Sequence, residues 1–453
     1  MASDPLLIVV LAAGKGVRMR SDLPKVLHPI AGRSMLAHVL FSARAAGAAR
    51  LAVVVAPDMD RVRAEAESCA PGIDVFEQSV PSGTASATLA ARPLLERHKG
   101  DVIVLFGDAP LLEAETLRHL VGALNAGAGI AALCFEAPEA TGYGRLLLDA
   151  AGRVTAICEH ADASEEQRRI GLCNAGAIAF RVPDLVALLA RIGSANAKRE
   201  YYLTDAVAIA AGDGLLTLPV RCAPEEALGV NSREQLAAAE AIWQRRARCK
   251  VMAAGATLVA PETVWLAADT LIGRDVTIEP NVFFGPGVRV EDGAHILAHC
   301  HLVGARIGRG ARVGPFARLR PGADIAEKAR IGNFVEIKNA KVETGAKANH
   351  LAYIGDARVG PGANIGAGAI FCNYDGFNKH FIDVGTGVFV GSNASLVAPV
   401  TIGDGAYIGS GSVITSNVEA DALALARSPQ EQRSGWAAKF RTMMGRRKKA
   451  RAG

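Results

Sequence analysis

The chain lacks any close pair of cysteines. Its 453 residues include eight cysteines, and no two of them stand in a Cys-x-x-Cys spacing. Zinc ribbons and disulfide frameworks depend on paired cysteines, so the sequence argues against both. We expect reduced thiols that are mostly packed, at Cys69, Cys134, Cys158, Cys173, Cys222, Cys249, Cys300 and Cys372.

A long hydrophobic run is also missing. The apolar stretch from Leu6 to Ala13 is far shorter than the ~20 residues that cross a bilayer, and its basic residues follow it instead of preceding it. We therefore expect no membrane span, no signal peptide and a cytoplasmic location.

An excess of positive charge is lacking outside the last residues. The formal net charge is +5, but residues 427–453 contain nine Lys/Arg and one Glu, a net of +8, which leaves −3 for the rest of the chain. Because the chain has no basic face, we expect no specific nucleic-acid partner. We expect residues 437–453 to form a solvated, disordered basic tail; a weak RNA or membrane contact is the less favoured alternative.

The glycine-rich stretch "LAAGKGVRM", residues 11–19, fits neither common nucleotide loop. A P-loop ends in Gly-Lys-Ser/Thr, whereas here Gly14-Lys15-Gly16 is followed by Val17 and Arg18. Met19 stands where the dinucleotide fingerprint needs its third glycine. Small residues after a buried strand nevertheless expose N–H groups that suit an anion. Arg18 and Lys25 add two positive charges, which favours a polyphosphate. An ordinary strand-to-helix turn is the alternative.

The first half of the chain alternates between two kinds of segment. From Pro5 to about Ala227, apolar strand candidates such as "LLIVVLAA" and "DVIVLFGD" alternate with Ala-rich helical stretches. This pattern predicts an α/β domain with a mostly parallel sheet, in which ligands lie beyond the carboxyl ends of the strands. Gly14 and Asp108 each follow such an end, so we expect them to face one crevice.

A long helix is predicted next. Ser232 and Gln235 in "NSREQLAAAEAIWQRRARCK" have capping-box spacing, and the good helix formers after them extend to about Gly255. We interpret this helix as the linker between two domains. The predicted divisions are a first domain at 1–230, the linker helix at 231–254, a second domain at 255–436 and the tail at 437–453.

Beyond Val264 the hydrophobic period changes to six residues, which is the signature of a parallel β-helix built from hexapeptide repeats. A Gly-rich β-sandwich is the alternative, and it would instead show period-two alternation with hairpin turns. The ladders of period six are Val264, Thr270, Val276, Val282 and Val288, then Ile307, Val313, Leu319, Ile325, Ile331 and Ile337, then Val384, Val390, Leu396, Ile402, Ile408 and Ile414.

Two segments interrupt the period. "KVETGAKANHLAYIGD" blurs it, and "FCNYDGFNKHF", residues 371–381, breaks it between Ile365 and Val384. A loop that leaves a rigid coil is a natural place for a site. The two segments carry the chemically useful side chains of His350, Tyr353, Asn373, Tyr374 and Lys379.

Several motifs together resemble a known family. "LAAGKGVRM", "LPKVL", "SGTASA", "LFGDAPLL", "GYGRL", "CNAGAIAF", "EYYLTD" and "GVNSREQL" are similar to sugar-nucleotide pyrophosphorylases. With "RLRPGA", "IGNFVEIKNA", "NHLAYIGDA", "NIGAGAIFCNYDGFNKH" and "VFVGSNASLVAPV", the chain resembles the bacterial bifunctional N-acetylglucosamine-1-phosphate uridylyltransferases / glucosamine-1-phosphate N-acetyltransferases from about residue 5 to 436.

The resemblance implies the fold and the reactions. It implies a Rossmann-like nucleotidyltransferase domain, a linker helix and a left-handed parallel β-helix that assembles as a homotrimer. It also implies acetylation of glucosamine 1-phosphate by acetyl-CoA, then UMP transfer from UTP to give UDP-N-acetylglucosamine, a precursor of peptidoglycan and lipopolysaccharide.

For UMP transfer the resemblance implies Mg²⁺ and a set of binding residues. Asp108 and Asn231 match the metal ligands, and Asn231 also matches a sugar contact. The phosphate loop matches at Leu11, Gly14, Gly16, Arg18 and Lys25, the uracil contacts at Gln78, Gly83 and Thr84, and the sugar contacts at Gly144, Glu159, Asn174 and Thr204.

For acetyl transfer, His350 matches the family's base, because a base must take the proton of the attacking ammonium. A structural histidine is the alternative for this residue considered alone. Positions matching the glucosamine 1-phosphate pocket are Arg320, Lys338, Tyr353, Asn364 and Lys379, and those matching acetyl-CoA contacts are Ala367, Asn373, Tyr374, Ser392, Ser410 and Arg427.

Three residues depart from the family's common choices: Val17 replaces Thr, Phe106 replaces Tyr and Ser410 replaces Ala. The first two changes remove a hydroxyl, which concerns kinetic detail and not the reaction. Two other hypotheses stay open: a nucleotidyltransferase whose β-helix serves assembly alone, and a catalytically silent regulatory subunit. The first leaves His350 and residues 371–381 unexplained, and the second predicts the loss of charged site residues that are all present.

Overall fold

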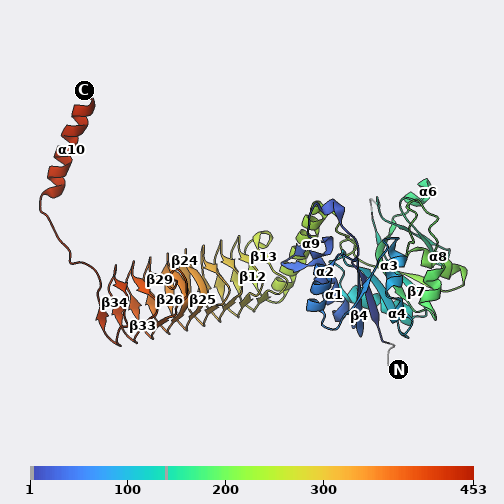
Figure 1. The fold of residues 1–453 in the computed structure, drawn as a ribbon, viewed down its shortest axis with the longest axis horizontal. Helices are drawn as coiled ribbons and strands as arrows, with labels where there is room; N and C mark the ends of the chain where they lie inside the picture. The colour runs from blue at the N-terminus through green and yellow to red at the C-terminus, as the bar shows by residue number, and fades with distance from the viewer. Residues whose placement is uncertain (1–4, 138–140, 453) are drawn as a thin grey trace. The chain divides into compact units, whose positions relative to one another are not determined.

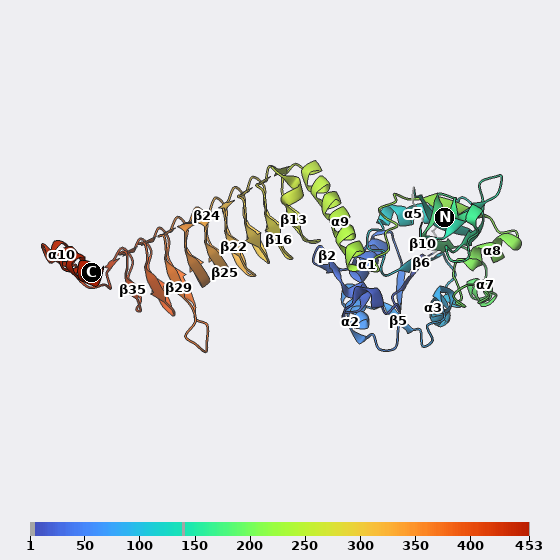
Figure 2. The same ribbon diagram turned by 90° about the horizontal axis from the view of Figure 1, so that it is seen from above.

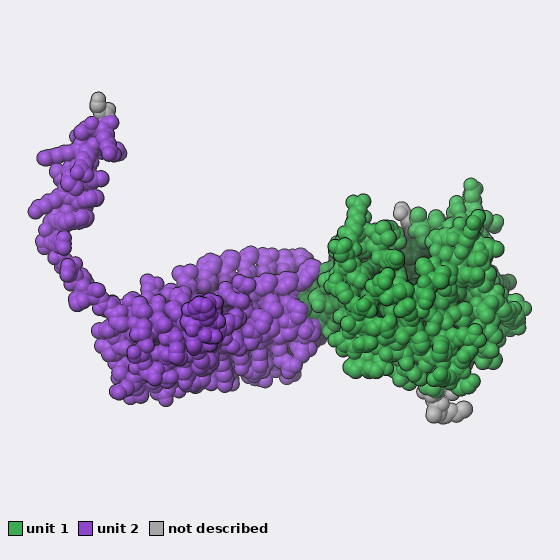
Figure 3. All heavy atoms as spheres, viewed as in Figure 1, with its two compact units in different colours: residues 1–250, 266–268 green, residues 251–265, 269–453 purple. Residues whose placement is uncertain are grey.

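The computed structural model describes residues 5–137 and 141–452, and the chain divides into two compact units. Unit 1 comprises residues 1–250 and 266–268, and unit 2 comprises residues 251–265 and 269–453 (Figure 3). None of the helices in the described residues is long and apolar enough to cross a membrane.

Unit 1 is built on a sheet whose central strands run parallel. Strand β1 pairs in parallel with both β4 and β6, with Leu11 opposite Phe106, so the loops after β1 and β6 leave the same edge. β10 is antiparallel to β6 and β7, which makes the sheet mostly but not wholly parallel, as predicted. Its strands, in order across the sheet, are β11 (Thr217–Arg221), β7 (Ile130–Glu136), β10 (Leu172–Phe180), β6 (Val102–Phe106), β1 (Leu7–Leu11), β4 (Arg50–Val55) and β5 (Asp74–Glu77), with β8 (Arg145–Leu148) and β9 (Val154–Cys158) beside β10.

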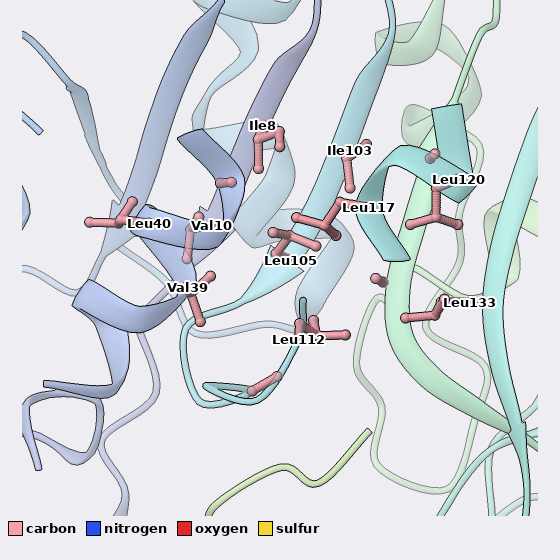
Figure 4. Packing of buried hydrophobic residues seen from close by; sticks show 14 of the residues in the cluster. Ile8, Val10, Val39, Leu40, Ile103, Leu105, Leu112, Leu117, Leu120 and Leu133 are labelled. Atoms are coloured by element: carbon pink, nitrogen blue, oxygen red, sulfur yellow. The ribbon is translucent and has the colours of Figure 1, made fainter. Parts of the chain in front are cut away.

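Helices cover both faces of this sheet, which explains why β1 is apolar throughout. Ile8 and Val10 point into one buried cluster with Leu105 (Figure 4), whereas Leu7 and Val9 point into another. Each fully buried side chain of this kind contributes about 1.5–3 kcal/mol. The helices are α1 (Met35–Ala45), α2 (Asp60–Cys69), α3 (Thr84–Ala90), α4 (Arg92–Leu95), α5 (Ala114–Asn125), α6 (Glu165–Arg168), α7 (Leu185–Ala190) and α8 (Asp205–Gly212), with a small ribbon of β2 (Pro29–Ile30) and β3 (Arg33–Ser34).

Helix α9 (Arg233–Ala253) lies where the long helix is predicted, and most of it is part of unit 1. The Gln244 side chain donates to the Leu266 carbonyl at 2.7 Å and accepts from the Leu266 N–H at 2.9 Å. Glu240 accepts from the Ala31 N–H at 2.7 Å. These contacts hold α9 against its own unit.

Unit 2 is a parallel β-helix whose short strands stack coil upon coil (Figure 1). Leu302, Leu319 and Ile337 are successive partners in one such stack, and all three are fully buried. The strands of the first sheet are β12 (Thr257–Leu258), β15 (Thr277–Ile278), β18 (His295–Ile296), β21 (Arg312–Val313), β24 (Arg330–Asn333), β26 (Lys347–His350), β28 (Asn364–Ile365), β31 (Phe389–Val390), β34 (Tyr407–Ile408) and β36 (Leu423–Ala424).

The remaining strands of the β-helix form a second, larger sheet of the same kind, and only Leu266 at the end of β13 is counted with unit 1. They are β13 (Trp265–Leu266), β14 (Leu271–Ile272), β16 (Phe283–Phe284), β17 (Arg289–Val290), β19 (His301–Leu302), β20 (Ala305–Ile307), β22 (Arg318–Leu319), β23 (Ala323–Ile325), β25 (Glu336–Val342), β27 (Tyr353–Val359), β29 (Ile370–Cys372), β30 (Ile382–Val384), β32 (Ser395–Val397), β33 (Val400–Ile402) and β35 (Val413–Ile414).

The predicted ladders form the core of the β-helix. The members of the second and third ladders, from Ile307 to Ile337 and from Val384 to Ile414, are all buried. In the first ladder Thr270 is only partly buried, whereas the valines are buried.

The expectation of a disordered tail is wrong. Residues Trp436–Ala452 form helix α10, with the side chains exposed as far as Arg451. Alanine, lysine, arginine and methionine have high helix propensity, and the segment has no proline and only Gly445 as a glycine, so a helix forms locally without a core to support it.

Candidate active sites

The glycine-rich loop follows β1 at the edge where the parallel strands end. Gly16 adopts a left-handed conformation with φ of 66° before the short 3-10 helix Val17–Met19. A Cβ at this position would collide with the Cβ of Lys25. Glycine therefore lets Lys25 pack directly against the loop.

Lys25 joins two residues from distant parts of the chain. Its side chain is largely buried, and its ammonium donates to the carboxylate of Asp108 and, at 2.9 Å, to Oδ1 of Asn231. The Val230 N–H donates to the Asp108 carbonyl at 2.9 Å, which brings the two oxygen-bearing side chains together. One oxygen of Asp108 and one of Asn231 therefore both accept from the Lys25 ammonium.

The start of α9 fixes Asn231. Gln235 Oε1 accepts from the Asn231 N–H at 2.7 Å, and the Gln235 N–H donates to Ser232 Oγ at 3.3 Å. Ser232 therefore caps the helix as predicted, because its hydroxyl accepts from the Gln235 N–H. The Gln235 side chain, however, accepts from the N–H of Asn231 and not from that of Ser232 as in a regular capping box. The helix start holds the Asn231 backbone in place.

A cavity of about 740 Å³ lies beside these residues and is lined by parts of the loops that follow β1, β4, β5 and β6. The predicted residues in its lining are Leu11, Gly14, Lys25, Gln78, Gly83, Thr84 and Asp108. Gln78 donates its amide N–H to the Gly83 carbonyl and to Ser86 Oγ, both at 3.1 Å. Its amide oxygen is thus turned away from these partners.

Four of the five predicted sugar contacts form a second group, whereas the fifth, Asn231, lies beside Lys25. The Asn174 N–H donates to the Gly144 carbonyl at 2.9 Å, and Thr204 Oγ1 donates to Glu159 at 3.1 Å. Burial raises the pKa of Glu159, although the Thr204 hydroxyl opposes this. The Leu203 N–H donates to Thr84 Oγ1 at 2.8 Å, which ties this group to the cavity.

In unit 2, cations from neighbouring coils come together. The Arg320 N–H donates to the Ile337 carbonyl at 2.8 Å, which sets Arg320 beside Lys338, and Lys338 lies opposite Gly355. The neighbouring Lys379 ammonium lowers the pKa of Lys338, with smaller contributions from burial and from Arg320. Such a group of cations suits a phosphate.

His350 is exposed on β26, and its ring is oriented by Asn333 of the preceding coil. Nδ1 of His350 lies 2.7 Å from Asn333 Oδ1. An amide oxygen only accepts, so Nδ1 is the donor in this contact, and Nε2 is the ring nitrogen left to take up a proton. This arrangement suits a base that acts through Nε2.

The loop after β29 leaves the stack of coils (Figure 2). It closes as a short hairpin in which Tyr374 pairs with Lys379, and the Asp375 carboxylate accepts from the N–H groups of Phe377 and Asn378 at 2.8 and 2.6 Å. Asp375 also accepts from His380 Nε2 at 2.7 Å. The N–H of Asn378, the His380 ring and the N–H of Phe377 lower the pKa of Asp375 to about 2.

The other predicted residues of the second site follow on later coils. The Asn393 N–H donates to the Ala367 carbonyl at 2.8 Å, and the Gly411 N–H donates to the Ser392 carbonyl at 2.9 Å. The Arg427 guanidinium donates to the Ser410 carbonyl at 3.0 Å, and the Asn364 N–H donates to the Val388 carbonyl at 2.8 Å.

Comparison with known proteins identifies the family. Residues 8–170 match the MobA-like NTP transferase domain, and residues 382–416 match the bacterial transferase hexapeptide repeat. The "Bifunctional protein GlmU" of Azorhizobium caulinodans is 57% identical over 99% of this chain and 100% of its own length, and that of Nitrobacter hamburgensis is 53% identical over 100% of both chains. The chain belongs to the GlmU family.

Membership of the GlmU family confirms the sequence-based prediction of a bifunctional enzyme, an acetyltransferase and uridylyltransferase on one chain. Nucleotidyl transfer in the GlmU family uses a divalent metal, and the hexapeptide repeat indicates an oligomer. The fold class predicted from the sequence is confirmed as well.

Not every residue predicted to bind the phosphates lines the cavity of unit 1. Arg18 of this GlmU family member is exposed and is not part of the cavity lining. Four residues that the sequence argument did not single out hold predicted ones in place. They are Asn333 beside His350, Glu336 beside Arg320, Asp356 beside Asn373, and Asp375 within the loop. Each of the four lies within or next to a motif that carries the family resemblance, and this position in the sequence is what could have indicated a supporting role.

Proposed function

We propose that the cavity of unit 1 transfers UMP from UTP to N-acetylglucosamine 1-phosphate, and that unit 2 first makes this sugar phosphate from glucosamine 1-phosphate and acetyl-CoA. The observation that carries the proposal is the meeting of Lys25, Asp108 and Asn231 beside the cavity. These residues come from distant parts of the sequence, and their charges suit a metal-bound polyphosphate.

In UMP transfer, the sugar phosphate attacks the α-phosphorus of UTP and pyrophosphate leaves, so no covalent enzyme intermediate is needed. The N–H groups around Gly14 and Gly16, with Lys25 and the exposed Arg18, are proposed to hold the phosphates and to stabilise the leaving group. Leu11 sets the direction of the loop at the end of β1.

The metal is proposed to be Mg²⁺. The residues fit it, because the oxygens of Asp108 and Asn231 converge on one cation, the ammonium of Lys25, and hard oxygen donors are what Mg²⁺ takes. Mg²⁺ usually has few protein ligands and binds substrate phosphates as well. When bound, it supplies positive charge that stabilises the phosphates during transfer. Asp108 and Asn231 would hold the metal, and the Lys25 ammonium, which these two side chains bind in this structure, would then turn toward a phosphate.

Recognition of the two substrates is assigned to separate groups. Gln78 is proposed to read uracil through its free amide oxygen, with Gly83 and Thr84 shaping the pocket. Gly144, Glu159, Asn174 and Thr204 are proposed to bind the acetylated sugar. Their mutual hydrogen bonds support one common pocket.

In acetyl transfer, the amine of glucosamine 1-phosphate attacks the thioester of acetyl-CoA, and a base must take its proton. We assign this to Nε2 of His350 because Asn333 already binds Nδ1. Arg320, Lys338 and Lys379 are assigned to the phosphate, and Tyr353 and Asn364 to the sugar. Asn373 and Tyr374 are assigned to the place where the thioester of acetyl-CoA meets the amine. The remaining acetyl-CoA contacts are assigned to Ala367, Ser392, Ser410 and Arg427.

The oligomer is proposed to be a homotrimer. One corner of the β-helix carries an exposed apolar row, in which Phe316, Phe334 and Leu351 are 47%, 55% and 58% exposed. Phe316 stacks on His299 at 4.7 Å and on Phe334 at 5.2 Å. Leu351 directly follows His350, so a second subunit that covers this row also closes over the base. We place the enzyme in the cytoplasm.

Half-reactions assayed separately test the proposal. When the protein is given glucosamine 1-phosphate and acetyl-CoA, mass spectrometry should detect N-acetylglucosamine 1-phosphate. When it is given N-acetylglucosamine 1-phosphate, UTP and Mg²⁺, mass spectrometry should detect UDP-N-acetylglucosamine. If the protein transfers UMP but not the acetyl group, the β-helix serves assembly alone and the proposed second site is wrong. Loss of both would refute the proposal.

A further inference from the structure

The carboxylate of Asp356 joins three coils at one corner of the β-helix. It is 8% exposed and stands in a left-handed conformation with φ of 46°. One oxygen accepts from the Asn339 amide at 2.6 Å, and the other accepts from the Asn373 amide. The three residues are spaced 17 apart in the sequence, so they occupy equivalent positions on successive coils.

This arrangement fixes which way the Asn373 amide faces. Because its Nδ2 donates to Asp356, its Oδ1 is left to accept a hydrogen bond from another group. Gly355 leaves room for this amide, since a Cβ there would lie only 3.0 Å from Asn373 Nδ2. Asn373 begins the loop that carries Tyr374 and Lys379, so its side chain lies where the loop joins the coil.

Asp356 also acts on the neighbouring cations. Burial raises its pKa, but the amides of Asn339 and Asn373 and the ammoniums of Lys379 and Lys338 more than offset this, so the pKa is lowered and the group stays charged. Lys379, burial and Arg320 lower the pKa of Lys338, whereas the carboxylate of Asp356 raises it.

We propose that Asp356 is a positioning residue for acetyl transfer: it aims the Asn373 amide oxygen toward the reacting amine and balances the positive charge of Lys338 and Lys379. It acts through these residues and does not touch the substrate. The inference rests on the proposed roles of Asn373, Lys338 and Lys379, and it deepens that site by adding a carboxylate beneath its phosphate-binding cations.

Asp356→Asn tests the proposal with nearly constant volume. The variant can accept only one of the two amide N–H groups, because its own NH₂ faces the other donor. We expect kcat/KM for acetyl transfer to fall about 10- to 100-fold, as for loss of a hydrogen bond to a charged group. Uridylyl transfer to supplied N-acetylglucosamine 1-phosphate in the same sample should be unchanged, which excludes misfolding of the whole chain.

The pH profile separates positioning from a merely structural role. Without the Asp356 charge, Lys338 loses its proton at lower pH, because Lys379 and Arg320 still repel it. The alkaline limb of the acetyl-transfer profile should therefore move to lower pH. Asp383→Asn is the matched control, since Asp383 accepts from Arg358 at 2.6 Å on a neighbouring coil outside the site. An unshifted limb in Asp356→Asn would overturn the charge role.

A double-mutant cycle with Asn373→Ala completes the test. If Asp356 acts through Asn373, Asp356→Asn should reduce kcat/KM much less in the Asn373→Ala background than in the wild type. Full additivity would overturn the positioning role. If Asn373→Ala and Lys338→Ala each leave acetyl transfer intact, the proposed site itself fails, and that outcome is distinct from failure of Asp356 alone.

Discussion

At the scale of single residues, each proposed site contains a buried ionisable group with hydrogen-bond partners. Lys25 and Asp356 are each less than a tenth exposed, and each is hydrogen-bonded to partners from another part of the chain or another coil. Burying a charge is unfavourable unless it is paired, so a sequence keeps such groups where they have a use. Glu159 is only partly buried, and the hydrogen bond from Thr204 offsets only part of the rise in pKa that this burial causes.

Replacing Lys25 tests the role of its ammonium. Lys25→Met keeps most of the side-chain volume but removes the charge that binds Asp108 and Asn231. We expect kcat/KM for UMP transfer to fall about 100- to 1,000-fold, as when one preorganised donor is removed. Steady-state kinetics of both half-reactions check this, and acetyl transfer should be unchanged. Wild-type UMP transfer in the variant would contradict the role.

The raised pKa of Glu159 predicts a dependence of stability on pH. The folded state binds its proton more tightly, so the free energy of unfolding falls as pH rises from about the ordinary pKa of 4.5 through the raised value. Glu159→Gln should remove this fall and raise Tm at pH 7 by about 2–4 °C, which corresponds to about 1 kcal/mol.

Thermal unfolding between pH 4 and 8 measures the Glu159 effect. The same variant should bind N-acetylglucosamine 1-phosphate more weakly, seen as a raised KM. A Tm difference that does not change with pH would mean that Glu159 is not the titrating group.

At the scale of elements, rigid coils carry a loop that is held by its own hydrogen bonds. The hairpin that begins at Asn373 has few contacts with a core, and Phe377 at its tip is 91% exposed. Asp375 is its main internal acceptor. Its depressed pKa means that this hold is complete above about pH 4 and is lost only as pH falls through about 2.

Asp375→Ala should release the loop. We expect KM for acetyl-CoA to rise about tenfold because Tyr374 loses its fixed position, and KM for glucosamine 1-phosphate to rise as well because Lys379 does, with UMP transfer unaffected. Limited proteolysis should cut the variant within residues 374–380 faster than the wild type. Asp375→Asn, which keeps an acceptor oxygen, should lie between the two. Equal cleavage and equal KM would show that the loop does not depend on this carboxylate.

Elements with a strict period were predictable from the sequence, whereas local irregularities were not. The ladder from Ile307 to Ile337 is buried as the six-residue period requires, because each coil repeats the same inward position. The helix at Trp436–Ala452 was missed because charge alone suggested disorder, although its residues favour a helix. Partners such as Asn333 and Asp356 become visible only when coils stack, since they lie 17 residues from the groups they hold.

At the scale of the whole molecule, the chain joins two chemistries in two compact units. The meeting of Asp108 with Asn231 could be inferred only in part: strand ends share an edge, but the Val230 hydrogen bond that completes the approach is a tertiary contact. The exposed apolar row at Phe316, Phe334 and Leu351 is proposed to link assembly to acetyl transfer, because Leu351 directly follows His350 in the sequence.

Phe334→Glu tests this link. A charge in the middle of the row should prevent association, since a buried unpaired carboxylate is strongly unfavourable. We expect a monomer by light scattering, loss of acetyl transfer by about 100-fold or more because the site is left open, and unchanged UMP transfer. Trp265→Glu, at another exposed position of the β-helix, is the control. A monomer with full acetyl transfer would contradict the shared site.

The central claim is that two independent sites act in sequence, and a mixing experiment tests it most directly. Purified His350→Ala and Asp108→Ala proteins are incubated separately and together with glucosamine 1-phosphate, acetyl-CoA, UTP and Mg²⁺, and products are identified by mass spectrometry. We predict that His350→Ala gives no acetylated sugar, that Asp108→Ala stops at N-acetylglucosamine 1-phosphate, and that the mixture makes UDP-N-acetylglucosamine. A mixture without this product, or either variant lacking both activities, would contradict the account.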